Sequence, residues 1–352
     1  MSADNLDYLW DTYTHRFLAE GVHYRDMMDI RGEIASMDQW CSVWSAWGNQ
    51  AEERADRALD AGLTRTAATE LARASTYYFF AQYLLWDDAE SKRAAHGNCV
   101  RTFRRAAQYL DPPQRPVDIP YGDITLPGYL TLPTGARKPP LVVLLGGLDT
   151  TKEEQLVINR LCAERGLATL TFDGPGQGET FARAKLTPDF GDAVGAVLDF
   201  AEKLAEIDGQ RLGIIGRSLG GFYAPRAAAL DGRVKAAVAW GAMYHLRNYA
   251  SMPELTQAGF LYVTGSESLE DARPYFESVD LDRIASRITC PLMIVHGGLD
   301  RITPTENATM MRDAAQGPTE LLFWEDSIHC AHDRSHICRP AMADFMGKWL
   351  TA

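Results

Sequence analysis

A serine lies at the centre of the pentapeptide Gly216-Arg217-Ser218-Leu219-Gly220, between an apolar run and a helix-forming segment. Residues 212–215 predict a buried strand, and residues 222–230 predict a helix. A serine held at a sharp turn between a strand and a helix has a strained backbone, and glycines two residues to either side let the turn fit between the two elements. Gly216 and Gly220 occupy those positions. The segment therefore predicts an α/β fold with Ser218 at the end of a strand.

The first 110 residues predict helices. Apolar and aromatic residues recur there at steps of three and four, which places them on one helix face; examples are Ala67, Leu71, Ala74, Tyr78, Ala81 and Leu85. Prolines 112, 113 and 116 cannot continue a helix. A chain of 352 residues suits one large domain with an accessory one. We therefore predict an all-helical N-terminal cap domain at residues 1–112.

Residues 113–352 have a different pattern, in which short apolar runs alternate with helical stretches. Alternating strands and helices predict a mostly parallel sheet flanked by helices; the predicted strands are residues 141–145, 168–172, 212–215, 234–240, 292–295 and 321–324. Residues 118–132, with Gly122-Asp123 at a turn, predict an antiparallel hairpin that leads into this sheet. The stretch from about 242 to 288 is too long for a single crossover helix and predicts a lid insertion.

Charge and composition disfavour several classes of partner. The formal net charge is −12, with 47 acidic and 35 basic residues, which would repel a phosphate backbone, so we expect no nucleic-acid partner. No apolar run approaches the roughly 18 residues that span a bilayer, and the N-terminal residues lack a signal-peptide pattern, so we expect a cytoplasmic protein without a membrane partner. The six cysteines show no metal-ligand spacing, so we expect no zinc site and no disulfide framework.

A serine nucleophile needs a histidine to accept its proton and an acid to orient that histidine. Asp300 follows the strand predicted at 292–295, and His329 follows the strand at 321–324. The order Ser218, Asp300, His329 matches the α/β-hydrolase arrangement. His332, three residues on, is the alternative base, and Asp173 is a less favoured alternative acid that we expect to bind loop amides.

The tetrahedral intermediate needs two amide donors for its oxyanion. The residue after the nucleophile, Leu219, is expected to supply one. The loop Gly146-Gly147-Leu148-Asp149 follows the strand at 141–145, and its paired glycines allow close approach to a substrate oxygen. Gly147 or Leu148 is expected to supply the second donor. A triad with two such donors requires no metal and no organic cofactor.

Nearly the whole chain resembles the branch of the α/β-hydrolases that contains 2,6-dihydroxypseudooxynicotine hydrolase and the fungal heptaketide-shortening hydrolases. The resemblance rests on residues 146–154, residues 172–179, residues 216–221 and the helical N-terminal part, including stretches such as Gly21-Val22-His23-Tyr24. It implies a serine hydrolase with Ser218, Asp300 and His329 as the triad. It also implies a homodimer.

The resemblance further implies cleavage of a carbon–carbon bond next to a ketone, in an aromatic or polyketide-like substrate, through an acyl-enzyme. Some relatives use an additional acid in the lid, and Glu254 is the only acidic residue between Met243 and Glu267. Candidate substrate-binding residues are Tyr244 and His245, after the strand at 234–240, together with Glu254 and Tyr83 of the aromatic-rich cap. The same triad would serve an ester or amide hydrolase, and a small-molecule binding protein on this scaffold is an alternative of another class.

Overall fold

The computed structural model describes residues 3–351, and the chain divides into two compact units. The first, which we name the helical unit, comprises the described residues up to Arg115 together with Glu153–Val157. The second, which we name the sheet unit, comprises Pro116–Lys152 and the described residues from Ile158 onward. Within residues 3–351, no helix combines the length and the apolarity that crossing a membrane requires.

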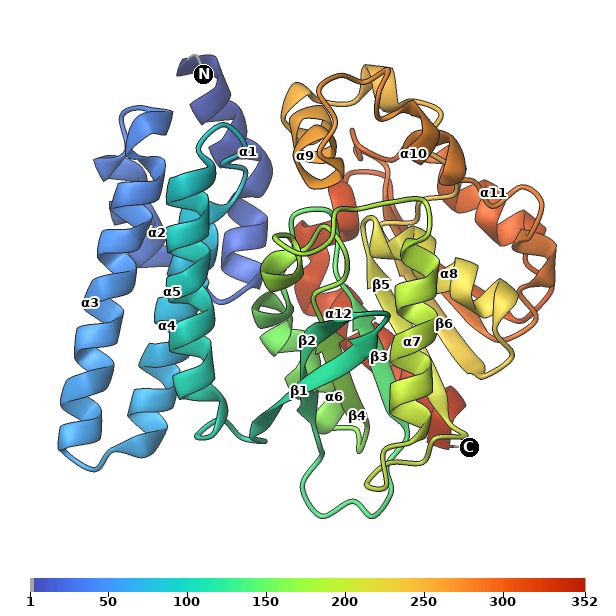
Figure 1. The fold of residues 1–352 in the computed structure, drawn as a ribbon, viewed down its shortest axis with the longest axis horizontal. Coiled ribbons are helices and arrows are strands. Elements are labelled where there is room, and N and C mark those ends of the chain that lie inside the picture. The colour runs from blue at the N-terminus through green and yellow to red at the C-terminus, as the bar shows by residue number, and fades with distance from the viewer. Residues whose placement is uncertain (1–2, 352) are drawn as a thin grey trace. The chain divides into compact units, whose positions relative to one another are not determined.

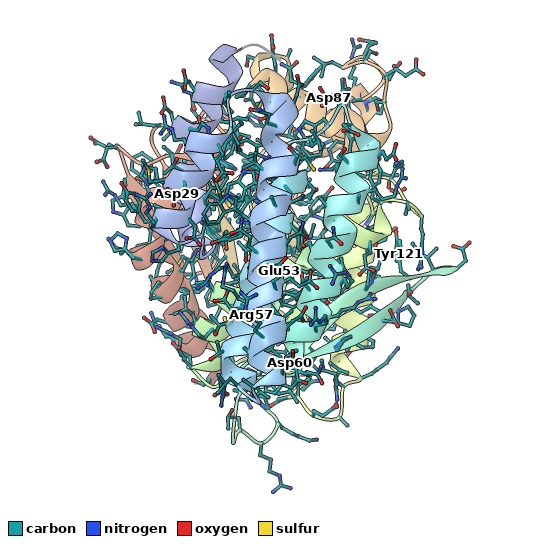
Figure 2. The ribbon with its side chains drawn as sticks, turned by 90° about the vertical axis from the view of Figure 1, so that its left-hand side faces the viewer. Asp29, Glu53, Arg57, Asp60, Asp87 and Tyr121 are labelled. Atoms are coloured by element: carbon teal, nitrogen blue, oxygen red, sulfur yellow. The ribbon has the colours of Figure 1, made fainter. Side chains whose placement is uncertain are left out.

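The helical unit is built from amphipathic helices, as its sequence periodicity predicts. They are α1 (Ala3–Ala19), α2 (Tyr24–Glu33), α3 (Trp40–Asp60), α4 (Thr64–Gln82) and α5 (Ala89–Ala107). Small residues of α3, among them Ala51 and Ala55, are fully buried, whereas Glu53, Arg57 and Asp60 lie along its outward face (Figure 2). Because one face of α3 is apolar, the helix is stable only when that face is packed against other residues.

Aromatic rings fill the interior of the helical unit. Phe80 lies 4.7 Å from Phe17 and 5.5 Å from Trp44 between ring centroids, and all three side chains are completely buried. The Trp40 indole Nε1 donates a hydrogen bond of 2.7 Å to the carbonyl of Phe80. Edge-to-face and tilted ring pairs of this kind add to the stability that burial already provides. These aromatic residues therefore form the hydrophobic core of the helical unit.

The sheet unit contains one eight-stranded sheet, in the order β1-β2-β4-β3-β5-β6-β7-β8 (Figure 1). The strands are β1 (Gln114–Tyr121), β2 (Ile124–Thr131), β3 (Leu141–Leu145), β4 (Ala168–Phe172), β5 (Leu212–Arg217), β6 (Val234–Trp240), β7 (Leu292–Gly297) and β8 (Thr319–Trp324). β2 pairs antiparallel with β4, and the ladders from β4 through β8 are parallel. The predicted α/β-hydrolase fold with a mostly parallel sheet is confirmed.

Helices cover both faces of this sheet. Outside the segment between β6 and β7, the helices after β3 are α6 (Leu156–Ala163), α7 (Phe190–Glu202), α8 (Gly220–Leu230), α11 (Glu306–Ala314) and α12 (Ser335–Thr351). Apolar side chains of α6 and α12 pack with alternate residues of β3, β5, β6 and β7 in one core cluster. α7 lies on the opposite side of the sheet from α12 in Figure 1 and packs on α8, with Phe190 and Tyr223 ring centroids 4.3 Å apart. Burial on both faces explains why the central strands are continuous apolar runs.

The segment between β6 and β7 leaves the sheet and carries α9 (Glu254–Thr264) and α10 (Arg273–Ser278). Its two ends meet, because the Leu246 amide donates to the Val279 carbonyl and the Leu281 amide donates to the Tyr244 carbonyl, each at 3.1 Å. Arg247 forms ion pairs with Asp280 and with Asp282. The segment therefore begins and ends at one narrow neck.

A buried ion pair joins the loops that follow β3 and β4. Lys152 Nζ lies 2.8 Å from the Asp173 carboxylate and 2.7 Å from Glu179, and the Lys152 and Asp173 side chains are each 1% exposed. Asp173 also accepts hydrogen bonds from the backbone amides of Lys152 and Glu179. Gly178 is needed here, since a Cβ at this left-handed position would lie 2.1 Å from Asp173 Oδ2. Asp173 is thus a structural acid that holds loop amides, as expected.

Removing one partner of this pair leaves a buried charge, which typically costs about 3–5 kcal/mol. We expect Lys152→Met to lower the free energy of unfolding by that order. The matched control is Arg25→Met, which removes a cation from the solvent-exposed pair of Arg25 with Asp29, and exposed pairs typically contribute less than about 1 kcal/mol. Chemical denaturation of the wild type and the two variants checks the difference. Equal small losses in both variants would contradict a stabilising role for the buried pair.

Candidate active site

Ser218 occupies the sharp turn between β5 and α8, as predicted. Its φ of 55° lies in the left-handed region, which is a strained conformation for a residue other than glycine. The Ser218 amide donates to the Trp240 carbonyl at 2.7 Å, and the Ser218 carbonyl accepts from the Gly221 amide at 2.7 Å. Hydrogen bonds on both sides of the residue hold its backbone in this conformation.

Close backbone contacts explain the glycines around the serine. A Cβ on Gly216 would lie 1.9 Å from the carbonyl oxygen of Gly220, and a Cβ on Gly220 would lie 2.7 Å from the carbonyl oxygen of Leu145. Real Cβ atoms do not approach backbone this closely, so neither position accepts a side chain without a shift of the strand or the helix. The pattern that singled out Ser218 in the sequence is therefore a steric requirement of the turn.

The structure brings Ser218, His329 and Asp300 into one chain of hydrogen bonds. His329 Nε2 lies 2.8 Å from Ser218 Oγ, and His329 Nδ1 lies 2.6 Å from Asp300 Oδ2. Asp300 Oδ2 also accepts from the Thr303 hydroxyl, while Oδ1 accepts from the amides of Ile302 and Thr303. Both nitrogens of His329 are therefore engaged in this chain. The geometry suits transfer of the serine proton to the histidine.

The charges of Asp300 and His329 are mutually stabilised. Burial by itself raises the pKa of Asp300, but the charge of His329 and its hydrogen bond outweigh burial, and the pKa of Asp300 is lowered from 3.8. Burial by itself lowers the pKa of His329, but the Asp300 carboxylate outweighs it, and the pKa of His329 is raised well above 6.5. The pair therefore favours a positively charged imidazole, the form a base adopts after it takes the serine proton.

Trp240, the last residue of β6, connects the serine turn to the loop that carries His329. Its indole Nε1 donates to the Cys330 carbonyl, and its own carbonyl accepts from the Ser218 amide and, at 3.7 Å, from the Cys330 thiol. Cys330 and Ala331 both have positive φ, at 58° and 48°. The guanidinium groups of Arg217 and Arg339 lie 5.4 and 5.2 Å from the Trp240 ring. The tryptophan thus holds a strained loop against the strand that also supports the serine.

Two of the predicted oxyanion donors, Gly147 and Leu219, lie beside the serine. Leu219 follows Ser218 and precedes the first turn of α8. Gly147 packs against the serine, because a Cβ placed on it would lie 3.1 Å from Ser218 Cβ. Among residues 3–351, the amides of Gly147, Leu148 and Leu219 donate to no other group. These amides are therefore available to a substrate oxygen.

His332, the alternative base, and His296, another histidine near the site, have other surroundings. His332 is buried beside Trp240, with ring centroids 5.8 Å apart, and it is His329 that contacts Ser218. His296, at the end of β7, is completely buried, and its Nε2 is 3.1 Å from the Thr303 carbonyl. Thr303 also donates hydrogen bonds to Asp300, so His296 contacts the residue that holds the acid.

Tyr244 and His245 lie at the neck of the segment between β6 and β7. Their amides both donate to Asn307 Oδ1, at 2.7 and 2.9 Å. His245 forms an isolated antiparallel bridge with Asp280, and burial lowers its pKa from 6.5. Tyr244 is 4% exposed. The contacts of both residues tie the neck to α11, and their predicted role in substrate binding stays a prediction.

The other two candidate substrate-binding residues have separate environments. Glu254 is the exposed first residue of α9. Tyr83 is fully buried in the helical unit, where its hydroxyl accepts a 2.7 Å hydrogen bond from Arg16. Arg16 also forms a buried two-point ion pair with Glu154. A role for either residue in binding substrate stays a prediction.

Three residues that sequence reasoning missed position the predicted ones. Thr303 binds both oxygens of Asp300, Trp240 holds the histidine loop, and Asn307 holds the neck. A signal existed for Thr303 and Asn307, because both follow Asp300 within seven residues on the loop and helix after β7. Trp240 carried no signal, since a tryptophan that ends a buried strand is indistinguishable from core.

The chain is similar over most of its length to a characterised hydrolase. It is 32% identical over 338 residues to 2,6-dihydropseudooxynicotine hydrolase of Paenarthrobacter nicotinovorans, which covers 96% of this chain and 91% of that protein. The crystal structure of 2,6-dihydroxy-pseudo-oxynicotine hydrolase superposes with a TM-score of 0.88 at 31% identity, covering 96% and 95% of the two chains.

Fungal hydrolases match a shorter part. Alpha/beta hydrolase psoB of Aspergillus fumigatus is 34% identical over 265 residues, which is 69% of this chain and 59% of that protein. A solved structure of wild-type AbyA5 matches nearly the whole chain, with 19% identity, a TM-score of 0.79 and coverage of 99% and 95%, and shares the fold. Residues 32–266 match the model of the family described as esterase FrsA-like. The predicted resemblance is confirmed, and the chain belongs to the FrsA-like family of α/β-hydrolases.

Proposed function

We propose that this protein is a serine hydrolase that cleaves a carbon–carbon bond adjacent to a ketone in an aromatic or polyketide-like substrate. The observation that carries the proposal is the unbroken chain of hydrogen bonds from Asp300 through His329 to Ser218. We assign Ser218 as nucleophile, His329 as general base and acid, and Asp300 as the group that orients the imidazole and stabilises its charge.

In the first step, Ser218 Oγ forms a bond to the ketone carbon while its proton passes to His329 Nε2. The π electrons of the carbonyl move to its oxygen, and the amides of Leu219 and of Gly147 or Leu148 stabilise that oxyanion. Collapse of the intermediate restores the carbonyl and breaks the carbon–carbon bond. The bonding pair leaves on carbon, and the imidazolium of His329 donates its proton there.

In the second step, water completes the reaction. His329, neutral again, takes a proton from water as the water oxygen bonds to the acyl carbon. Collapse of the second tetrahedral intermediate breaks the ester bond to Ser218, which recovers its proton from His329. The products are a carboxylic acid and a protonated carbon fragment.

The choice of bond rests on the family relationship. A carbon leaving group is harder to expel than an alkoxide, so the substrate itself must store the negative charge, as an enolate or an electron-rich aromatic ring does. The similarity to 2,6-dihydropseudooxynicotine hydrolase over nearly the full length of both proteins supports this substrate class. Ester hydrolysis is the second candidate, because the matching family model is described as an esterase.

We also propose that the chain forms a homodimer, which the resemblance to this branch implies, and that it acts in the cytoplasm. Sedimentation or light scattering of the purified chain tests the dimer.

We expect serine-dependent release of an acid and an intact carbon fragment from an aryl β-diketone or an acylated polyhydroxyarene, at a rate near or above that for an aryl ester of matched shape. Ser218→Ala removes the nucleophile and should abolish both products, measured by mass spectrometry. Ser42→Ala, at an exposed position of α3, is the control and should retain activity. Fast ester cleavage with the ketone untouched would favour the esterase alternative. Ligand binding by a wild type that a fluorophosphonate does not label would favour a binding protein.

We expect activity to rise with pH through the pKa of His329, because only the neutral imidazole accepts the proton of Ser218. Since that pKa is raised, the midpoint of the acidic limb of kcat/KM should lie above pH 6.5. Asp300→Asn removes the stabilising charge, so the midpoint should fall and the rate should drop by about 10⁴. Measuring kcat/KM across pH for the wild type and Asp300→Asn checks both the midpoint and the drop in rate.

The control for the pH profile is His336→Gln, which alters an exposed histidine at the start of α12. Its midpoint should equal that of the wild type. A wild-type midpoint below pH 6.5, or one that Asp300→Asn leaves in place, would contradict the proposed pairing of Asp300 with His329.

A further inference from the structure

Gln177 forms a bridge between the two loops that follow β3 and β4. Its side-chain Nε2 donates a 2.8 Å hydrogen bond to the carbonyl of Gly147, and its Oε1 accepts a 3.0 Å hydrogen bond from the amide of Gly174. The residue is 6% exposed. Because Oε1 accepts from the Gly174 amide, the NH₂ group lies at the other end of the side-chain amide, where it faces the Gly147 carbonyl.

The bond to Gly147 determines the direction of the next amide. The carbonyl of Gly147 and the N–H of Leu148 belong to one planar trans peptide and point in opposite directions. β3 lies between β4 and β5 in the sheet, so the loop after β3 has Gln177 on its β4 side and Ser218 on its β5 side. A carbonyl held toward Gln177 turns the Leu148 N–H toward the serine.

The surroundings leave this bridge little freedom. The Lys152–Asp173 ion pair links the same two loops. A Cβ on Gly146 would lie 3.4 Å from Gln177 Nε2, which shows how closely the side-chain amide packs on the loop. The Leu148 amide itself donates to no group among residues 3–351. Its orientation is therefore set from the carbonyl side of the peptide.

We infer that Gln177 is a positioning residue that aims the amide of Leu148 at the substrate oxyanion, and that Leu148 rather than Gly147 supplies the second donor. The inference rests on the proposed serine mechanism. Gln177 acts through the peptide and does not touch substrate. Its loss should affect states that carry an oxyanion, and leave binding of the neutral ketone unchanged.

The test uses Gln177→Glu, which keeps the length of the side chain and an acceptor for Gly174. At neutral pH it replaces the NH₂ donor with a carboxylate oxygen that repels the Gly147 carbonyl. We expect kcat to fall by up to about 100-fold, the loss that misplacing a catalytic group by 1 Å can cause, with KM nearly unchanged. In the neutral variant Gln177→Met, the pH midpoint set by His329 should stay in place.

A pair of inhibitors separates positioning from a structural effect. Ser218 adds to an aryl trifluoromethyl ketone to give a hemiketal oxyanion, whereas the corresponding secondary alcohol cannot react and only occupies the site. Gln177→Glu should weaken inhibition by the ketone by the same factor as kcat falls and leave inhibition by the alcohol unchanged. Equal weakening of both inhibitors, with a raised KM, would overturn the inference, as would unchanged kcat and ketone affinity in a folded variant.

Two further variants complete the design. Gln177→Met is neutral and of similar length but has no donor, so it gives the same test if Gln177→Glu fails to fold, as judged by thermal melting. Gln316→Glu is the matched control, because Gln316 Nε2 also donates to a backbone carbonyl, that of Ala314, at an exposed position; it should behave as wild type.

Trifluoromethyl ketone inhibition that is equally strong in Ser218→Ala would overturn the serine mechanism itself, before any Gln177 variant is made.

Discussion

The left-handed backbone of Ser218 is the constraint on which the rest of the sheet unit depends. Such a conformation costs about 1–3 kcal/mol and persists only where the surroundings impose it. Here β5 delivers the residue, β6 receives its amide and α8 starts directly behind it. Gly216 and Gly220 allow these elements to approach closely enough. The strain exposes the hydroxyl at the carboxyl edge of the sheet, next to the loops that follow β3, β7 and β8.

Much of this arrangement could be predicted from the sequence. The central strands are buried on both faces, so they appear as short apolar runs. Five of the six predicted strands begin at the predicted residue in the structure, and all six end within two residues of the predicted end. The chemistry-bearing residues follow those runs, and parallel strands bring their carboxyl ends to one edge. The distances among Ser218, His329 and Asp300 agree with the predicted triad, whose catalytic role stays a prediction. The predicted hairpin turn at Gly122-Asp123 lies between β1 and β2.

Other features depend on contacts between distant residues and leave no local pattern. Nothing near Trp240 in the sequence indicates that its indole reaches Cys330, and nothing near Lys152 indicates that its cation is buried against Asp173. The left-handed residues Cys330 and Ala331 have side chains that disfavour this conformation, so propensity points away from what tertiary contacts impose. Aromatic residues such as Trp44 suit a pocket or a core equally by composition, and only packing distinguishes the two.

Trp240 holds two loops at the same point, the end of β6. The serine turn and the histidine loop, whose reacting residues are 111 positions apart, are both fastened to the end of β6. The segment between β6 and β7 starts directly after Trp240 and begins and ends at its own neck. It contributes to neither of the hydrogen bonds by which Trp240 holds the two loops. Natural selection can therefore lengthen, shorten or exchange that segment to suit new molecules while the spacing between nucleophile and base is inherited unchanged. Diversity among relatives is expected to concentrate there.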